Sequence, residues 1–304
     1  MCDISQFYNC DLVQAPKQSQ FHKKGNFRCA KVMVIFMKTA IRLTALLCLL
    51  FMLGGMLCSC GMIAESWKTV RLTGEVVTNT YAIENCAEEI ALSVHLNFVN
   101  GGNNVITVRP TPEGMEPYYE MTYPADFIEW GLTTYYEDGR LSVEIVPSRQ
   151  GQRQFSTDDF AMTVYANVTS YDLVGSHSLK ADLGGGDVSA LKLQITGGAA
   201  VEMKNIAAET VTVAVDGAAD VVLSGTADRL DTEINGAGVL ESGALTVRQG
   251  AVTVNGVGTA DVSCTETLNV EINGAGTVQY RGEPELTKTI NGLGTVSKLP
   301  DETS

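Results

Sequence analysis

INGAGTV (residues 272–278) and INGLGTV (residues 290–296) are two copies of nearly the same segment, 18 residues apart near the carboxyl end of the chain. Aligning the sequence on the first glycine of this segment gives six copies at intervals of 18 to 20 residues. Their turn glycines are Gly197, Gly217, Gly236, Gly256, Gly274 and Gly292. Self-similarity at a period of about 20 residues is typical of solenoids, in which each repeat forms one coil.

Each copy combines two apolar strands with a tight corner between them. Apolar residues alternate with polar ones before the corner, as in Leu268, Val270 and Ile272, which is the period of a half-buried strand. Asn-Gly and Asp-Gly are turn sequences because both residues accept left-handed backbone readily. Three positions repeat around the turn glycine: an aliphatic residue before it (Ile195, Val215, Ile234, Val254, Ile272, Ile290), a small residue after it (Ala199, Ala219, Gly238, Gly258, Gly276, Gly294) and a second apolar residue (Val201, Val221, Leu240, Ala260, Val278, Val296).

Matching residue types at matching positions arise when coils stack on one another. We therefore predict an all-β fold, with a right-handed parallel β-helix (solenoid) of about 18–20 residues per coil at residues 161–300. A β-rich segment at residues 61–160 precedes it. The alternative is an antiparallel sandwich, in which each Asn-Gly closes a two-residue hairpin.

The corners also carry a family resemblance. The repeated Gly-Ala-Gly and Gly-Leu-Gly corners and the stretch Tyr280-Arg281-Gly282-Glu283-Pro284 resemble the GIN-domain family of auto-transporter adhesin heads. The resemblance covers roughly residues 67–298, and many members are lipoproteins of gut Bacteroidetes. It implies a β-helix and an adhesin-like role, and it supplies no catalytic residues. Members commonly have Ser-Gly-Ser-Gly-Asp corners, whereas here Asn-Gly replaces Ser-Gly and only Asp220 keeps the acidic position.

The amino terminus has the pattern of a targeting segment. Lys38 and Arg42 precede an uncharged run from Leu43 to Cys60, as in secretory signals. Leu57-Cys58-Ser59-Cys60 resembles the bacterial lipobox, which implies cleavage before Cys60 and lipidation of its thiol. We predict a lipoprotein signal peptide at residues 37–60, preceded by a non-native or unstructured extension at residues 1–36. A membrane-spanning helix is less favoured, because the run reaches about 20 residues only if it extends to Ala64.

Charge and cysteine content restrict the possible partners. After residue 42 the chain has 14 basic and 33 acidic residues, so we expect no nucleic-acid partner. Beyond Cys60 only Cys86 and Cys264 remain, either paired in an oxidising periplasm or as two free thiols. No Cys-x-x-Cys motif or Cys/His zinc spacing occurs in this part. We therefore expect no metal and no cofactor.

The segment before the repeat has its own strand signals. Leu92–Phe98 alternates strictly, Val105–Val108 follows as a further strand, and Asp138-Gly139 predicts a hairpin turn. A short helix is expected near Pro124–Gly131, and an exposed loop at Ser148–Thr157. The segment is either a separate small domain or the irregular opening of the solenoid, where it caps the first coil.

Aromatic residues crowd into the middle of this segment. Seven of them lie within the nineteen residues from 118 to 136. Exposed Tyr and Trp rings beside carboxylates can stack on sugar rings, which makes six of them candidate ligand-binding residues: Tyr118, Tyr119, Tyr123, Trp130, Tyr135 and Tyr136. The alternative is a local aromatic core beneath the cap.

No catalytic constellation is evident in the sequence. Gly175-Ser176-His177-Ser178 lacks the second glycine of a nucleophile elbow, and the adjacent side chains of Asp158 and Asp159 point apart. Gly184-Gly185-Gly186-Asp187 is similar to a Ca²⁺-binding nonapeptide but occurs only once, which favours a mobile corner. We therefore predict a protein that is not an enzyme.

The resulting prediction is a lipid-anchored outer-membrane protein of the cell envelope whose β-helical head binds a ligand without catalysis. Its partners would be the membrane, through the lipid anchor, and a glycan or a host or matrix protein. One alternative is a carbohydrate-active β-helix enzyme of the polysaccharide lyase or pectinase type. Another is a self-assembling envelope scaffold, although Pro284 and Pro300 favour a capped end. The surface or periplasmic orientation and the oligomeric state stay open.

Overall fold

The structure is a computed structural model that describes residues 68–96, 104–145 and 153–300, which belong to one compact unit. The predicted extension, the signal peptide and Cys60 lie outside these residues. No helix in the described ranges is long and apolar enough to span a membrane. In chain order the elements are β1 (Lys68–Arg71), β2 (Val76–Ala82), β3 (Ile90–Leu96), β4 (Val105–Arg109), β5 (Tyr118–Pro124), α2 (Asp126–Glu129), β6 (Leu132–Glu137), β7 (Arg140–Ile145), β8 (Arg153–Ser156), β9 (Ala161–Tyr165), β10 (Val168–Asp182), β11 (Val188–Ile234), β12 (Ala237–Val254), β13 (Val257–Ile272), β14 (Ala275–Arg281), β15 (Glu285–Ile290) and β16 (Thr295–Lys298).

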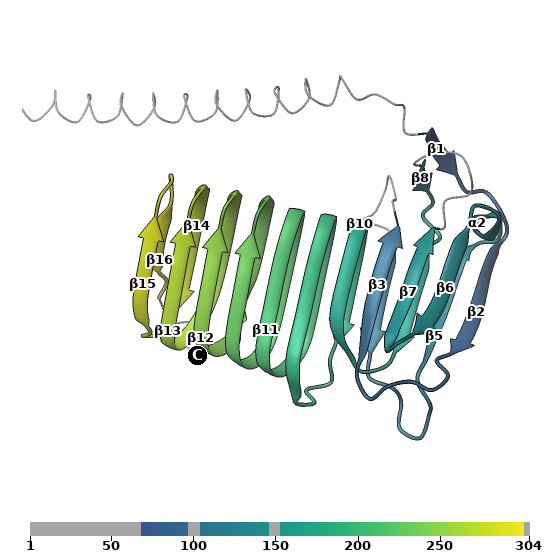
Figure 1. Cartoon of the computed structure of the whole chain (residues 1–304), viewed down its shortest axis with the longest axis horizontal. Coiled ribbons are helices and arrows are strands. Elements are labelled where there is room, and N and C mark those ends of the chain that lie inside the picture. Colours follow the sequence, from purple (N-terminus) through teal and green to yellow (C-terminus); the bar gives the residue numbers. More distant parts are fainter. Residues whose placement is uncertain (1–67, 97–103, 146–152, 301–304) are drawn as a thin grey trace, which may run out of the picture. The chain divides into compact units, whose positions relative to one another are not determined.

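The repeat folds as a parallel β-solenoid of about 6 turns, which confirms the predicted fold class (Figure 1). Strands β10 to β13 pair in parallel in chain order, and β14, β15 and β16 continue the stack. The aliphatic residues before each corner stack directly, since Val254 is in register with Ile272 and Ile272 with Ile290. Identical positions of successive repeats are therefore neighbours in space, and the antiparallel sandwich is excluded.

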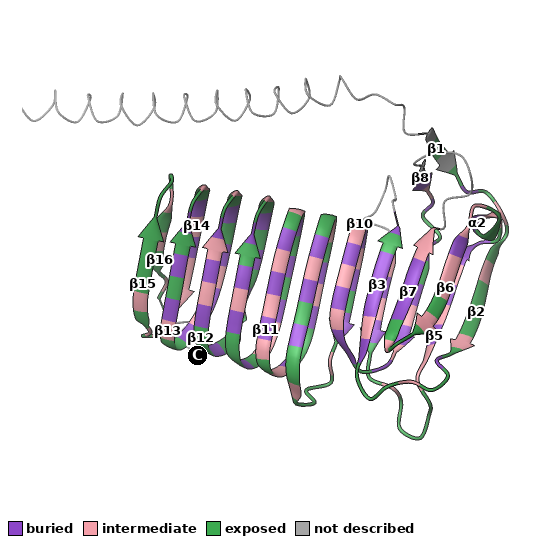
Figure 2. Cartoon of the chain, in the orientation of Figure 1, coloured by how far each residue is buried: buried purple, intermediate pink, exposed green. Residues whose placement is uncertain are grey.

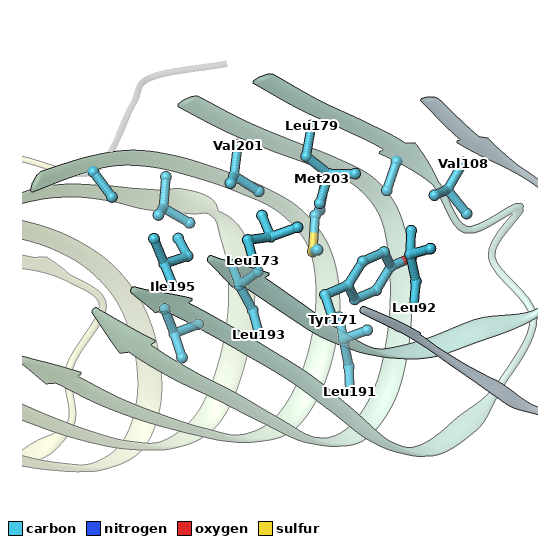
Figure 3. Packing of buried hydrophobic residues seen from close by; sticks show 14 of the residues in the cluster. Leu92, Val108, Tyr171, Leu173, Leu179, Leu191, Leu193, Ile195, Val201 and Met203 are labelled. Carbon is cyan, nitrogen blue, oxygen red and sulfur yellow. The ribbon is translucent and has the colours of Figure 1, made fainter. Parts of the chain in front are cut away.

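The core runs through the inside of the coils. Buried and exposed residues alternate along each strand, as the banding in Figure 2 shows. Leu173, Leu193 and Ile195 point inwards from one wall, and Leu179, Val201 and Met203 meet them from the opposite wall (Figure 3). Each fully buried aliphatic side chain of this kind stabilises the fold by about 1.5–3 kcal/mol relative to exposure. The two apolar ladders recognised in the sequence thus form the two walls of one core.

The reason for the corner glycines differs from the one expected. Among the repeated turn glycines only Gly197 has a left-handed φ, of 123°. A Cβ on Gly236 would instead lie 1.9 Å from the carbonyl oxygen of Gly217, and one on Gly256 would lie 2.0 Å from that of Gly236. Glycine is required because each corner packs directly against the corner of the previous coil. The prediction of a tight corner was right, but its explanation by left-handed backbone was wrong.

The segment before the repeat joins the same sheet and covers its first coil. β10 pairs in parallel with β3 and β4, which in turn pair in parallel with β7 and β9. The strands β2, β5 and β6 add antiparallel pairs at this end. The predicted hairpin is confirmed, with φ of 50° at Asp138 and 75° at Gly139, as a type I′ turn requires. The predicted short helix is α2.

One local prediction in this segment was wrong. Part of the expected exposed loop Ser148–Thr157 is strand β8, which pairs in parallel with β1. Phe155 of β8 is buried and packs against Phe127 of α2, with ring centroids 5.0 Å apart. This pairing joins residues about 85 positions apart, beyond the reach of a local sequence pattern.

Candidate binding surfaces

The candidate aromatic residues do not form one exposed face. Tyr119 and Tyr123 are buried, with 6% and 4% of their surface exposed. Tyr123 Oη contacts Asn79 Nδ2 at 3.0 Å and Tyr81 Oη at 3.1 Å, while Tyr119 Oη contacts Thr134 Oγ1 at 2.8 Å. Burial raises the pKa of Tyr81 to about 12. These rings form an aromatic core in the capping segment, which was the alternative interpretation of the cluster.

The four other candidates are more accessible but are dispersed over different elements. Tyr118 stacks on Tyr165 of β9, with ring centroids 4.5 Å apart. Trp130 and Tyr136 are half-buried against the core, and Tyr136 Oη accepts a hydrogen bond from the Ala87 amide at 2.9 Å. Tyr135 is 42% exposed. The structure therefore narrows the aromatic prediction to these four residues, and ligand binding by them stays a prediction.

Ser93, His95 and Asp172 come together on the outward side of β3 and β10, where His95 is exposed and Ser93 is only 6% exposed, a grouping that the sequence did not suggest. Ser93 Oγ lies 3.1 Å from His95 Nε2, and Asp172 Oδ2 lies 3.3 Å from the same nitrogen. In a catalytic triad the carboxylate holds Nδ1 so that Nε2 is free to accept the serine proton. Here both groups compete for Nε2, so the arrangement is a surface hydrogen-bond cluster and does not activate the serine.

His177 occupies a core position where later coils have alanine or glycine. It is 3% exposed, and its Nε2 lies 2.8 Å from the carbonyl oxygen of Val174. Burial lowers the pKa of His177, which keeps the imidazole neutral. Its contacts are those of a packed core residue.

The glycine-rich stretch after β10 forms a corner that is held by one carboxylate. Asp182 Oδ1 accepts hydrogen bonds from Asn205 Nδ2 at 2.8 Å and from the Gly184 amide at 3.0 Å. These two bonds, the one from Asn205 first, lower the pKa of Asp182. Gly184 and Gly185 have left-handed φ of 68° and 71°. A pocket of about 380 Å³ lies beside this corner, between Pro110, Asp187 and their neighbours.

Potential metal ligands and thiols are not assembled into a reactive centre in the described part of the chain. No group of three or more His, Cys, Asp or Glu side chains is placed to hold a metal ion there. Cys86 and Cys264 are both free thiols, and burial raises the pKa of each. Cys264 Sγ contacts the carbonyl oxygens of Thr267 at 3.1 Å and Arg248 at 3.3 Å.

A row of asparagines runs along the corners, and its side chains bond from coil to coil. Asn291 Nδ2 donates to Asn273 Oδ1, Asn273 to Asn255 and Asn255 to Asn235, each at 2.8 Å. Asn235 Nδ2 then donates to Asp216 Oδ1, also at 2.8 Å. We call this row the Asn ladder. The repeated asparagines are visible in the sequence, but turn chemistry alone does not predict that their side chains bond from coil to coil.

The surface directly beyond the corners has very little charge, and Glu241 and Asp261 lie in the next outward column. Two outward columns cross it, and we call them the flat face: Ala218, Ala237, Val257 and Ala275, continued by Leu293, in one column, and Asp220, Val239, Thr259, Thr277 and Thr295 in the other. Asp220 is its single charged residue, in a chain whose net charge is -14. Val239, Val257 and Leu293 are 38%, 56% and 86% exposed. A shallow pocket of about 520 Å³ lies over these columns.

The last coil leaves part of its core open. Leu286 and Val296 are half-buried and Ile290 is 39% exposed, whereas the equivalent Ile272 of the preceding coil is fully buried. Lys288 is in register with Val270 and so occupies an apolar core column. An inward-pointing charge on an edge strand discourages pairing with another strand.

Comparison with known proteins agrees with this architecture. A family model described as "Putative auto-transporter adhesin, head GIN domain" matches residues 128–284, which is more than half of the chain. The chain belongs to this GIN-domain family. The family points to a binding module of the cell envelope or cell surface, and its description names no catalytic activity. Among curated proteins, none matches the chain.

Solved structures share the fold of this GIN-domain chain at low identity. A putative adhesin from Bacteroides fragilis NCTC 9343 is 18% identical and has a TM-score of 0.62, with 76% of this chain and 100% of that chain covered. A putative lipid binding protein from Parabacteroides distasonis ATCC 8503 is 18% identical with a TM-score of 0.56, covering 77% and 100%. A putative adhesin from the same strain is 18% identical with a TM-score of 0.53, covering 76% and 100%. At this identity the likeness concerns the fold alone.

Proposed function

We propose that the protein is a lipid-anchored, non-catalytic binding module of the bacterial cell envelope, with an adhesin-like role. Membership of the GIN-domain family supports the binding role. The lipobox-like Leu57-Cys58-Ser59-Cys60 supports an anchor at Cys60. A solenoid suits this role because its stacked coils hold an extended surface rigidly.

The flat face is the surface that best supports binding. Proteins seldom expose contiguous apolar side chains without a use for them, and charge is depleted at the centres of interfaces. Val239, Val257 and Leu293 are exposed together on this face, and Asp220 is its only charge. This coincidence of exposed apolar side chains with charge depletion is the observation that carries the proposal.

The chemistry of the face favours an uncharged ligand. Apolar side chains alternate with the hydroxyls of Thr259, Thr277 and Thr295, which suits the apolar faces and hydroxyl groups of neutral sugar rings. The acidic body repels uronic and sialic acids over distances of about 10 Å at 0.1 M salt. We therefore propose a neutral glycan, or an uncharged patch of a matrix protein, as the ligand.

A binding screen with matched variants tests this assignment. The protein is presented to neutral and acidic glycans and to immobilised matrix proteins. Val257→Asp should abolish capture of a neutral ligand, while Asn269→Asp, which places the same charge on an outer column of the same strand, should preserve it. Tyr135→Ala tests the remaining exposed aromatic candidate. Loss of capture with Tyr135→Ala but not with Val257→Asp would move the site to the capping segment.

The anchor is tested separately. Metabolic labelling with an alkyne fatty acid should mark the wild-type chain and leave Cys60→Ser unlabelled, and the variant should leave the membrane fraction. Labelling that persists in Cys60→Ser would refute the anchor site. Protease treatment of intact cells carrying a carboxyl-terminal tag then gives the orientation. Loss of the tag, with a periplasmic control intact, supports an adhesin, and full protection would exclude one.

A further inference from the structure

The Asn ladder has two unlike ends. Its first member is Asp216, a carboxylate that accepts a hydrogen bond from Asn235. Its last member is Asn291, whose Nδ2 donates to Asn273 while its Oδ1 faces the open end. Within the described residues no side chain donates a hydrogen bond to Asn291 Oδ1. The side-chain oxygens of Asn235, Asn255 and Asn273 each accept one from the next coil.

The four asparagines of the ladder each precede a glycine, so each can undergo the same reaction. They are Asn235, Asn255, Asn273 and Asn291. The backbone nitrogen of the glycine attacks the side-chain carbonyl carbon of the asparagine. The new C–N bond closes a succinimide ring, the bond to the side-chain nitrogen breaks, and ammonia leaves with the proton of the glycine amide. Water then opens the ring at either carbonyl and yields aspartate or isoaspartate. Glycine favours this reaction because it has no side chain to obstruct the approach.

In the coils of Asn255 and Asn273 the ladder restrains the side chain and the backbone restrains the amide of the following glycine. Ring closure requires the side chain of the asparagine to rotate towards the following amide. In Asn255 and Asn273 that rotation would break two ladder bonds, because each residue both donates and accepts. The amides of Gly256 and Gly274 also contact the carbonyl oxygens of Ile234 and Val254 at 3.3 Å.

The last coil has fewer of these restraints. Rotation of Asn291 breaks a single ladder bond, and Gly292 is exposed whereas Gly274 and Gly256 are half-buried. The corner lies between β15 and β16, which form the edge of the described sheet. Edge segments open locally at a lower free energy than interior coils, which carry a neighbour on both sides.

We propose that Asn291 is a site of spontaneous deamidation, and that its conversion exposes Asn273 to the same reaction. The product has an oxygen where Nδ2 donated, so a carboxylate oxygen faces Asn273 Oδ1 across the 2.8 Å of the former hydrogen bond. Two acceptors at this distance repel each other, and the last coil loosens. Asn273 then becomes the end of the ladder. The structure assigns the order Asn291, Asn273, Asn255 and Asn235, although the four dipeptides are identical.

Peptide mapping by mass spectrometry tests this order. The purified full chain is incubated at mildly alkaline pH, and deamidation at each asparagine is followed over time, in buffer and in concentrated urea. Each folded rate is divided by the unfolded rate at the same residue, which removes the effect of neighbouring sequence. The ratio for Asn291 should exceed that for Asn255 by at least about tenfold, because local opening controls the folded rate. Equal ratios, or a larger ratio at Asn235 or Asn255, would overturn the proposal.

A second variant tests the inward propagation. Asn291→Asp mimics one product and should speed deamidation of Asn273 severalfold from the start of the incubation. Asn269→Asp adds the same charge on a neighbouring column without touching the ladder, and should leave the rate at Asn273 unchanged. An unchanged rate in Asn291→Asp, or an equal acceleration in Asn269→Asp, would overturn propagation along the ladder. Circular dichroism on both variants confirms that the coils remain folded.

Discussion

At the scale of single residues, the corner glycines show how stacking selects an amino acid. The nitrogen and carbonyl groups of one corner occupy the space where a Cβ on the next would lie. This requirement comes from a residue about 20 positions away and does not depend on φ. Other glycines in the same chain have open space where a Cβ would lie. Packing therefore distinguishes the glycines that stacking requires from those that it does not.

Gly256→Ala should therefore destabilise the protein by about 3 kcal/mol, because its Cβ would overlap the carbonyl of Gly236 and the backbone of two coils must separate. Gly186→Ala is the matched control, since a Cβ there meets nothing within 4 Å. The free energy of unfolding of that control, measured in urea, should stay within about 0.5 kcal/mol of the wild type. Equal effects of the two substitutions would refute the stacking explanation.

Tyr171 has an uncommon environment for a phenol. It is 1% exposed, it lies among aliphatic side chains in the first full coil, and its Oη has no hydrogen-bond partner among the described residues (Figure 3). An unsatisfied buried polar group costs about 1–3 kcal/mol. Tyr171→Phe should raise the free energy of unfolding by about 1 kcal/mol. A clear loss of stability would show that the hydroxyl has a bound partner, such as an internal water.

At the scale of elements, the Asn ladder has a fixed direction. Asp216 can only accept, so every amide above it turns its nitrogen towards the amino-terminal side and its oxygen towards the last coil. The ladder thereby links successive corners along one side of the solenoid. Asparagine serves two roles here, since its backbone forms the corner and its side chain joins neighbouring coils.

Asn255→Asp should consequently destabilise more than Asn255→Ala. The aspartate places an acceptor opposite Asn235 Oδ1 at the position of the 2.8 Å hydrogen bond, whereas alanine leaves both neighbours free to bond water. We expect a difference of about 1 kcal/mol in urea unfolding at neutral pH. Equal stability of the two variants would mean that the amides reverse at no cost and that the ladder has no set direction.

Lys288 discourages the edge strand of the last coil from pairing with another molecule. It stands in the core column above Val270, so a partner strand added to β15 would bury an unpaired ammonium group. Lys288→Val should therefore promote concentration-dependent self-association in size-exclusion chromatography. Thr287→Val, on the outward side of the same strand, should elute as the wild type does. A Lys288→Val protein that elutes identically at every concentration would contradict this function of the lysine.

At the scale of the whole molecule, the two ends of the described stack differ. Antiparallel strands lie at the first coil, while the last coil exposes Ile290 on the same strand as Lys288. Head-to-tail stacking would have to join the apolar edge of the last coil of one molecule to the capping segment of the next, whose strands are already paired. This asymmetry weighs against the scaffold alternative and favours a binding head that acts through its sides.

Stability as a function of pH should report the buried His177. Its folded pKa lies below the ordinary value of about 6.5, so the unfolded chain binds more protons as the pH falls through that value. The contribution of the neutral imidazole is therefore complete above about pH 7.5 and is lost progressively on acidification. Urea unfolding at pH 7.5 and pH 5 should show a smaller loss for His177→Ala than for the wild type. Parallel losses would mean that His177 binds its proton equally in the folded and unfolded states, as a solvated imidazole does.

The repeat could be predicted well because its signals are local and recur. Alternation around Val270 and Ile272 identifies a strand, Asn273-Gly274 identifies a corner, and six copies identify a stack. The capping segment has no such recurrence. The pairing of β1 with β8 and the burial of Tyr119 and Tyr123 depend on strands far apart in sequence. Composition alone could not show which of these aromatic rings would face the solvent.

The strand period, the coil length and the inward-facing ladders follow directly from the amino-acid sequence, because alternation and turn residues act over a few positions. The stacking of the coils explains why the corners need glycine, sets the direction of the Asn ladder and places one of four identical Asn-Gly pairs at the edge of the described sheet. It also decided which outward columns combine into a nearly uncharged face. Each of these features depends on a contact between coils. Such a contact joins residues 18 to 20 positions apart, and it cannot be predicted from the type of either residue alone.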